Sequence, residues 1–306
     1  MSQPSAYEQY MLELINAERA KVGAQPLAFD GDLNEAAEDH SQWMIATDTF
    51  SHTGANGSDP TARLTAAGYA LDGSWATGEN IGWATTRSPE GLQDEVDLLH
   101  SNLMNSSGHR ANILDTNYRE IGVGFETGDY GGRDSAFVTQ NFAKTGTSAL
   151  LTGVAFDDKD GDRFYDPGEG LGGITVTVTT TDGAVIGSTT TMDAGGYDIP
   201  LAAGTYNVTF SGGGVASTTQ QVTIGSSNVK VDLADPAMVG GEQASQPQPE
   251  PESNVGTTVA GSDQPSQPEP GSNVGTASGE SIPSADSFTF NTSLFNTSLA
   301  DFLVIS

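Results

Sequence analysis

The sequence predicts an α/β protein in which an α-β-α sandwich is followed by a small antiparallel β-sandwich and a disordered tail. Three observations support this prediction. Up to about residue 146, segments with apolar residues at helical spacing alternate with short strand-like segments. From residue 150 to 235, strand-like segments recur roughly every 8 to 12 residues between Gly and Asp turns. Beyond residue 236, Pro, Gln, Glu, Ser and Gly dominate the composition. We therefore expect domains at residues 5–146 and 150–235, a linker at 236–280 and a separate C-terminal segment at 281–306.

The composition limits the partners of this protein. The chain has 306 residues, of which 40 are acidic and 11 basic, and its formal net charge is -29. Binding to nucleic acid needs clustered Lys and Arg, so we expect no nucleic-acid partner, whereas divalent cations are favoured. Because the chain has no cysteine, any metal must be held by His, carboxylate or backbone oxygen. No apolar run reaches the roughly 18 residues of a membrane span, so we do not expect an integral membrane protein.

The first domain contains start and stop signals for four helices. The predicted starts are Ser5 with Glu8, Asp32 with Glu35, Asp59-Pro60 and Ser88-Pro89, and the clearest stops are Gly23 and Gly68. Strands are predicted at residues 80–83, 121–125 and 136–142. Helices that flank a small, mostly antiparallel sheet form a layered α-β-α domain. His40 and His100 lie on apolar faces of the second and fourth helices, where we expect them to pack in the core.

Three short motifs of this domain each hold one side chain that can bind a metal or transfer a proton. They are Phe50-Ser-His-Thr-Gly54, Gly78-Glu-Asn-Ile-Gly82 and the turn Asn105-Ser-Ser-Gly-His-Arg-Ala-Asn-Ile-Leu114. His52, Glu79 and His109 could bind zinc and leave one position open for water. Alternatively, Glu79 does not bind the metal but hydrogen-bonds a metal-binding histidine and fixes its tautomer. A third interpretation is that all three motifs only shape loops. The sequence contains neither a Gly-x-Ser-x-Gly nor a His-Glu-x-x-His motif.

These motifs, taken together, resemble the CAP superfamily of cysteine-rich secretory, antigen 5 and pathogenesis-related class 1 proteins, in its cysteine-free bacterial branch. The resemblance covers nearly all of residues 5–145. The matching stretches are Ser51-His-Thr-Gly54, Asp59-Pro60 with Arg63-Leu64 and Ala67-Gly-Tyr69, Gly78-Glu-Asn-Ile81, Gly108-His-Arg-Ala-Asn-Ile-Leu114 and Glu120-Ile-Gly-Val-Gly124. The resemblance implies a CAP-type α-β-α sandwich with an open cleft lined by two histidines and acidic residues.

Carried over by residue, His52 and His109 match the two cleft histidines of the family, and Glu79 matches the glutamate of its Gly-Glu-Asn motif. Ser106 stands where animal and plant members have a second glutamate, and Leu103 stands where they have a tryptophan. Glu95 on the fourth helix could supply the missing carboxylate.

Membership in this family does not imply a single activity, so two functions stay open. The first is a binding module whose cleft holds Zn²⁺ or another divalent metal and an extracellular ligand, such as a lipid, a cell-wall polymer or a protein. The second is a metal-dependent extracellular hydrolase acting on peptide or cell-surface polymer, with His52, Glu79 and His109 as its catalytic residues. Ser106 favours the first function because it removes a candidate general base.

The second domain begins with a candidate calcium loop. Carboxylates fall at positions 1, 3, 5, 9 and 12 of a twelve-residue segment, and the residue at position 7 can offer its carbonyl. These residues are Asp158, Asp160, Asp162, Asp166 and Glu169, with Phe164 at position 7. The glycine usual at position 6 is replaced by Arg163. A solvated acidic turn is the alternative interpretation.

The segments around this loop resemble the B-type domains of serine-aspartate-repeat bacterial surface proteins. The stretches that carry the resemblance are Gly153-Val-Ala-Phe-Asp-Asp158, Gly168-Glu-Gly-Leu-Gly-Gly-Ile-Thr-Val176, Asp193-Ala-Gly-Gly-Tyr197 and Ala203-Gly-Thr-Tyr206. The resemblance implies a β-sandwich spacer that is stiffened by Ca²⁺.

The C-terminal segment indicates export from the cell. The chain ends in Asp301-Phe-Leu-Val-Ile-Ser306, an acidic residue followed by apolar ones. This ending resembles the uncleaved signal of type I secretion substrates, so we expect the type I export machinery as a partner and an extracellular location. The first residues of the chain lack the basic and apolar regions of a cleaved signal, which fits that route. A frayed tail or a partner-docking strand is the alternative.

Overall fold

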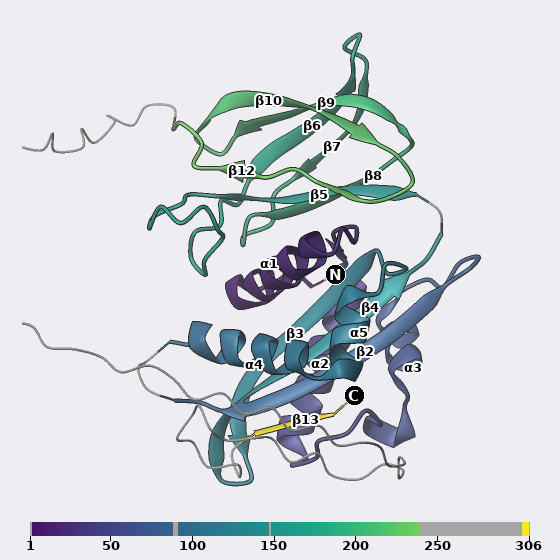
Figure 1. Cartoon of the computed structure of the whole chain (residues 1–306), viewed down its shortest axis with the longest axis vertical. Helices are drawn as coiled ribbons and strands as arrows, with labels where there is room; N and C mark the ends of the chain where they lie inside the picture. Colours follow the sequence, from purple (N-terminus) through teal and green to yellow (C-terminus); the bar gives the residue numbers. More distant parts are fainter. Residues whose placement is uncertain (1, 88–90, 147, 239–301, 306) are drawn as a thin grey trace, which may run out of the picture. The chain divides into compact units, whose positions relative to one another are not determined.

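A computed structural model describes residues 2–87, 91–146, 148–238 and 302–305. As predicted, the first domain is an α-β-α sandwich (Figure 1). Its helices are α1 (Ala6–Lys21), α2 (Gly31–Ala46), the short 3₁₀ helix η1 (Ala55–Gly57), α3 (Pro60–Ala67), α4 (Gln93–Asn105) and α5 (Ser107–Leu114). None of the described helices is long and apolar enough to cross a membrane.

A five-stranded sheet forms the middle layer, in the order β1-β3-β4-β2-β13. Its strands are β1 (Ala28–Phe29), β2 (Ala76–Thr85), β3 (Glu120–Tyr130), β4 (Arg133–Lys144) and β13 (Phe302–Ile305). Strand β1 is parallel to β3, and the other neighbours are antiparallel. Strand β13 comes from the C-terminal segment and pairs with residues 81–84 of β2. The rest of that segment and the linker predicted from residue 239 onward lie outside the described residues.

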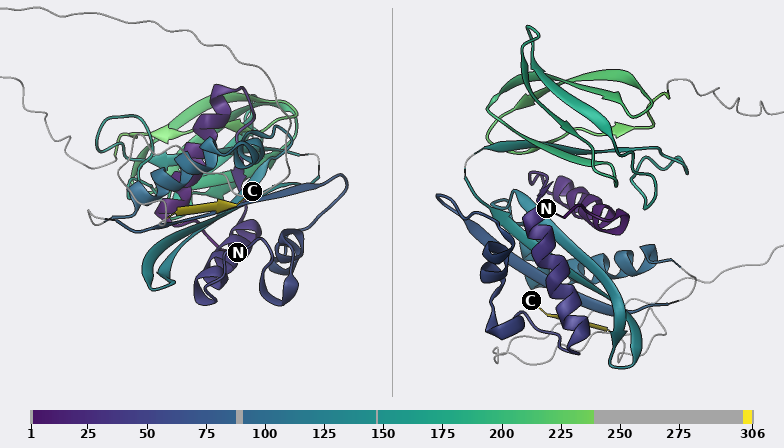
Figure 2. Two further views of the ribbon diagram at one scale, coloured as in Figure 1. Left: turned by 60° about the horizontal axis from the view of Figure 1, so that its bottom comes forward. Right: turned by 180° about the vertical axis from the view of Figure 1, so that it is seen from behind.

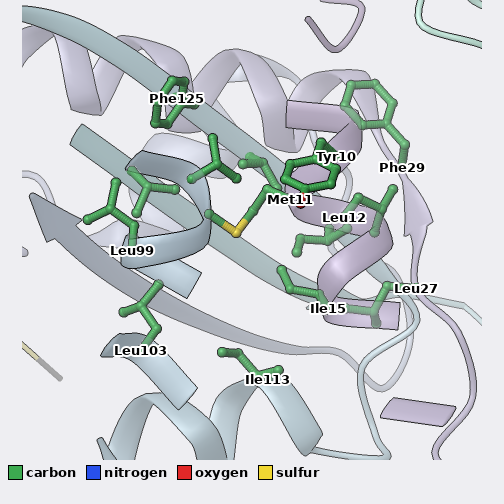
Figure 3. Packing of buried hydrophobic residues seen from close by; sticks show 14 of the residues in the cluster. Tyr10, Met11, Leu12, Ile15, Leu27, Phe29, Leu99, Leu103, Ile113 and Phe125 are labelled. Carbon is green, nitrogen blue, oxygen red and sulfur yellow. The ribbon is translucent and has the colours of Figure 1, made fainter. Parts of the chain in front are cut away.

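The helices cover both faces of the sheet (Figure 2). Helices α1, α4 and α5 lie on one face and enclose the largest apolar core of the domain. Figure 3 shows Met11 and Ile15 of α1 directed toward the leucines of α4 and toward Ile113 of α5. Helices α2 and α3 lie on the opposite face, where a smaller cluster forms around Leu33 and Leu64.

Helix α2 rests directly on the backbone of β3. A Cβ atom added to Gly124 would lie 2.2 Å from the carbonyl carbon of Ala37, and one added to Gly122 would lie 2.1 Å from that of Leu33. No side chain fits at such distances, so the two glycines of the Gly-x-Gly sequence permit this close approach. Polar side chains of α2 complete the contact, since Ser41 Oγ donates to the Gly124 carbonyl at 2.9 Å.

Two helix starts differ from the predictions, and one helix was not predicted. The second helix is capped by Asp30, whose carboxylate accepts hydrogen bonds from two backbone N–H groups, and not by Asp32. The fourth helix begins at Gln93, several residues after Ser88-Pro89, because Gly91 adopts a positive φ of 129° that no helix tolerates. Residues 107–114, predicted as a turn, form helix α5.

Other details agree with the predictions. Helix α1 has the capping box of Ser5 and Glu8, and α3 runs from the Asp59 cap to Gly68, which has a φ of 115°. His40 and His100 are buried, as expected for core positions.

The second domain consists of two sheets, in agreement with the predicted sandwich class. One is antiparallel with the order β10-β9-β6-β7, and the other is built on β5, which pairs with β8, β11 and β12. The bounds are β5 (Ala149–Phe156), β6 (Ile174–Thr180), β7 (Val185–Thr190), β8 (Gly196–Leu201), β9 (Gly204–Gly212), β10 (Val215–Ile224), β11 (Val229–Lys230) and β12 (Leu233–Ala234). Strands β11 and β12 pair with β5 in parallel, which the alternation pattern did not indicate.

The contact between α2 and β3 leads to a stability prediction. Replacing Gly124→Ala forces the helix away from the sheet, and we expect a loss of about 3 kcal/mol in the free energy of unfolding. The control is Gly225→Ala, because a Cβ there meets nothing within 4 Å; we expect a change within about 0.5 kcal/mol. Urea unfolding of both variants measures the difference. Equal stability of the two variants would show that α2 does not depend on this glycine.

Candidate functional site

The loop that follows α2 is attached to the helix through His40. The ring atom Nε2 of His40 lies 3.0 Å from the Ser51 carbonyl oxygen. A carbonyl can only accept, so Nε2 carries the proton and the neutral ring has its lone pair on Nδ1. Burial lowers the pKa of His40 to about 4, which keeps the ring neutral at physiological pH. His40 therefore fixes the position of Ser51 and of the next residue, His52.

His52 meets the carboxylate of Glu79 at the N-terminal part of β2. The distance from His52 Nδ1 to Glu79 Oε1 is 2.7 Å. The other carboxylate oxygen, Oε2, forms an ion pair with the guanidinium of Arg63 on α3. The side chain of Glu79 is only 2% exposed, so both of its oxygens are held by these two partners rather than by water.

Arg63 connects this pair to the loop. Its NH1 atom donates to the carbonyl oxygens of His52, at 3.0 Å, and Ser58, at 3.1 Å. Planar guanidinium donors match a carboxylate and carbonyl oxygens at the same time, which a lysine could not do. The arginine thus holds the loop and orients Glu79. No functional role was predicted for Arg63, although it lies in one of the motifs that carry the family resemblance.

The position of the proton on His52 follows from this network. The carboxylate of Glu79 accepts, so Nδ1 of His52 is the donor and the lone pair of the neutral ring lies on Nε2. Nε2 is buried and has no hydrogen-bond partner among the residues that the structure describes. A nitrogen in this state can bind a metal ion or accept a hydrogen bond from a ligand.

His109 is anchored on α5 at the other face of the sheet. The side chain of Asn80 donates to the His109 carbonyl at 3.1 Å, and Asn112 donates to Asn80 Oδ1 at 2.9 Å. Successive strand residues point to opposite faces, so Asn80 faces α5 while Glu79 faces α3. His109 is 1% exposed.

The structure brings His52 and Glu79 into contact, but it does not bring all three predicted residues into one ligand group. Among the described residues, Asp158, Asp160 and Asp162 form the only group of three or more His, Cys, Asp or Glu whose donor atoms lie within 4.8 Å of one another. Strand β13 covers β2 only at residues 81–84. In the described part of the chain, Glu79 and Asn80 therefore lie at the edge of the sheet.

The two remaining cleft candidates are placed near α4 and α5. Ser106 is the residue between these helices, and its side chain makes no capping hydrogen bond. Glu95 is fully buried, and its Oε1 atom accepts from the backbone N–H of Arg87 at 2.8 Å. Burial raises the pKa of Glu95. Its carboxylate is thus directed to the segment before α4.

In the acidic loop of the second domain, the carboxylates of Asp158, Asp160 and Asp162 lie close to one another. These carboxylates accept from backbone N–H groups inside the loop, for example from Gly161 to Asp158 at 3.0 Å. Glu169 is buried and accepts from the N–H groups of Lys159, at 2.7 Å, and Asp166, at 3.0 Å.

The remaining loop positions are also held by contacts within and outside the loop. Arg163 adopts a φ of 66° where a glycine was expected. Asp166 accepts from Gln93 at 2.7 Å, and burial together with Asp162 and Asp160 raises the pKa of its carboxyl. Phe164 is half-buried against the ring of Tyr10, with 6.1 Å between the ring centroids.

Comparison with known proteins identifies the first domain. Residues 12–142 match the model of the cysteine-rich secretory protein family, CAP. The first domain is a CAP domain. It is 36% identical over 124 residues to the uncharacterised protein YkwD of Bacillus subtilis, a match that covers 40% of this chain and 44% of YkwD. It is also 29% identical over 137 residues to the uncharacterised membrane protein YlbC of the same organism, covering 45% of this chain and 34% of YlbC. The chain thus spans less than half the length of these relatives.

A solved structure also resembles this CAP domain. It is an extracellular protein containing an SCP domain from Bacillus anthracis, with 27% identity, a TM-score of 0.35, and coverage of 45% of this chain and 40% of that chain. The second domain matches a different family: residues 165–234 match the model of carboxypeptidase regulatory-like domains. That match agrees with a β-sandwich.

Proposed function

We propose that this protein is an extracellular bacterial binding protein whose CAP domain holds a divalent metal ion, such as Zn²⁺, and an extracellular ligand. His52 supplies the metal-binding nitrogen Nε2, and His109 is the second protein ligand. The ligand is of the classes expected from the family, a lipid, a cell-wall polymer or a protein. The main observation in support is the bond between His52 and Glu79, because it leaves Nε2 as a buried lone pair.

Glu79 acts in this proposal by accepting a hydrogen bond from Nδ1 of the metal-binding His52. A histidine that binds a metal commonly donates its other N–H to a carboxylate, which fixes the ring and raises its basicity. Because His52 and Arg63 each hold one oxygen of Glu79, we assign metal binding to the histidine nitrogen rather than to this carboxylate. A bound metal would supply a Lewis acid at Nε2.

The contacts of Glu79 with His52 and Arg63 also favour a binding function over hydrolysis. A general base needs a free oxygen or nitrogen beside the attacking water, and Glu79 has both oxygens occupied, while Ser106 offers no carboxylate. The metal-dependent hydrolase stays as the second candidate, because Nε2 of His52 could itself accept a proton.

Metal content tests the proposed cleft. We expect purified protein to bind about one zinc ion per chain at this cleft and the variant His52→Ala or His109→Ala to bind none. The variant Glu79→Gln should bind zinc about 10- to 100-fold more weakly, as is usual when the hydrogen-bond partner of a metal-binding histidine is removed. The control is His100→Gln, which alters a buried histidine of α4 without touching the cleft. Zinc binding that survives in both His52→Ala and His109→Ala would reject the site, and zinc-dependent hydrolysis of peptides or polymers that His52→Ala abolishes would favour the hydrolase.

We also propose that the acidic loop of the second domain binds Ca²⁺, through Asp158, Asp160, Asp162, Asp166, Glu169 and the carbonyl of Phe164. Three observations support it: the convergence of three aspartates, the raised pKa of Asp166 beside them, and the spacing of the ligands. The calcium ion would neutralise carboxylates that otherwise repel one another. The domain would then act as a stiffened spacer similar to a B-type domain.

Thermal unfolding tests this calcium site. We expect millimolar CaCl₂ to raise the Tm of the full chain, and the double variant Asp160→Ala/Asp162→Ala to lose this rise. The control Asp182→Ala/Asp193→Ala removes two carboxylates outside the loop and should keep it. A rise of the same size in all three proteins would show that calcium acts elsewhere.

For the extracellular location we propose export by the type I route, with residues 281–306 as the signal. The support is the sequence of residues 301–306, four of which form strand β13. Deletion of residues 281–306 should abolish secretion from a host with a type I exporter, while deletion of residues 242–280 should not. Secretion of the first variant at the normal level would reject this route.

A further inference from the structure

A pocket of the CAP domain lies between α2 and α3, and its lining includes neither His52 nor Glu79. Its volume is about 260 Å³. Its lining comes from one side of α2, from η1 with the residue after it, and from α3, and the polar lining residues are Glu35, Asp39, His40, Ser58 and Arg63. The alkyl lining consists of alanines, and Trp43 adds an indole.

His40, one of the lining residues, carries a buried acceptor atom without a partner. His40 is 1% exposed, and its proton lies on Nε2 because that atom bonds the Ser51 carbonyl. The lone pair is therefore on Nδ1, which has no hydrogen-bond partner among the residues that the structure describes. A buried acceptor left without a donor destabilises the folded protein. This destabilisation is offset when a ligand supplies the missing donor.

Other polar groups converge on the same place. Nδ1 of His40, Oγ of Ser58 and NH1 of Arg63 all lie within 3.3 Å of the point where a Cβ on Gly54 would stand. Gly54 is the N-cap of the η1 turn, and none of the residues of η1 is buried. A small outward movement of the turn would thus expose Nδ1 to the pocket.

The chemistry of the lining selects the ligand. Nδ1 accepts and cannot donate, so the ligand must bring an N–H or O–H group. Glu35 and Asp39 add two negative charges to the lining, whereas the charge of Arg63 is already paired with Glu79; the surroundings therefore favour a cation and repel an anion. A metal ion is disfavoured, because in the described part of the chain these residues do not belong to any group of three converging donors. Trp43 and the alanines suit a short carbon chain.

We propose that this pocket is a second binding site, which takes a primary ammonium group on a short aliphatic chain, as in a small alkylamine or a lysine side chain. The ammonium group donates to His40 Nδ1, while Glu35 and Asp39 balance its charge and the carbon chain lies along Trp43. The site is independent of the metal proposed at His52.

The test is a titration of the full chain with n-butylammonium chloride, followed by NMR at the His40 ring nitrogens and the Trp43 indole N–H. We expect saturable shifts at both residues, and the same shifts in His52→Ala. The NMR measurement keeps His40 unchanged, because a substitution of His40 would also remove its hydrogen bond to the Ser51 carbonyl. Absence of saturable shifts at His40 would overturn the proposal.

Two comparisons test the chemistry. The double variant Glu35→Gln/Asp39→Asn, which changes two exposed residues, should bind n-butylammonium about tenfold more weakly. The matched variant Asp72→Asn/Asp134→Asn removes two exposed charges that do not line the pocket and should bind it normally. The neutral analogue 1-butanol should bind at least about tenfold more weakly than the ammonium. Equal binding of alcohol and ammonium, or an unchanged affinity of the first variant, would overturn the assignment to a cation.

Discussion

Helix α2 lies on the bare backbone of β3 at Gly122 and Gly124, and the positions of both proposed binding sites depend on this contact. Because the helix cannot move closer to the sheet or farther from it without loss of packing, His40 is held at a fixed distance from β3. His40 in turn holds the Ser51 carbonyl. This contact places the next residue, His52, against one oxygen of Glu79, and Arg63 of α3 pairs with the other oxygen. The close approach of α2 to Gly122 and Gly124 thus determines the position of Nε2 of His52.

His40 and His52 lie near each other but carry their protons on different ring nitrogens. The acceptor of His40 is a carbonyl at Nε2, whereas the acceptor of His52 is a carboxylate at Nδ1. Each ring therefore offers its lone pair at the opposite atom, Nδ1 for His40 and Nε2 for His52. The two lone pairs serve different ligands in our proposals, an ammonium group and a metal ion. In a chain with a net charge of -29, both of these ligands are cations.

Local signals in the sequence predicted much of the CAP domain, and the failures have physical causes. Asp59-Pro60 and Gly68 predicted α3 because a cap, an N1 proline and a left-handed glycine act within one helix. Helix α5 was missed because Gly108, His109 and Asn112 are weak helix formers, and α5 gains its stability from Ile113, which is buried in the core, and from the bonds of Asn80 and Asn112. The parallel pairing of β11 with β5 joins residues nearly 80 positions apart, a distance at which alternation carries no information about the partner. Glu79 was recognised from its motif, but the role of Arg63 needs the three-dimensional proximity of α3 and β2.

The hydrogen bond from His52 Nδ1 to Glu79 fixes the His52 ring, so that Nε2 is the ring nitrogen without a hydrogen-bond partner among the described residues. Nitrogen-15 NMR of the imidazole rings in metal-free protein at neutral pH measures this directly. For the neutral form of each ring, the structure predicts the proton on Nδ1 of His52 and on Nε2 of His40. A His52 ring with its proton on Nε2, or one that exchanges rapidly between the two tautomers, would contradict this assignment.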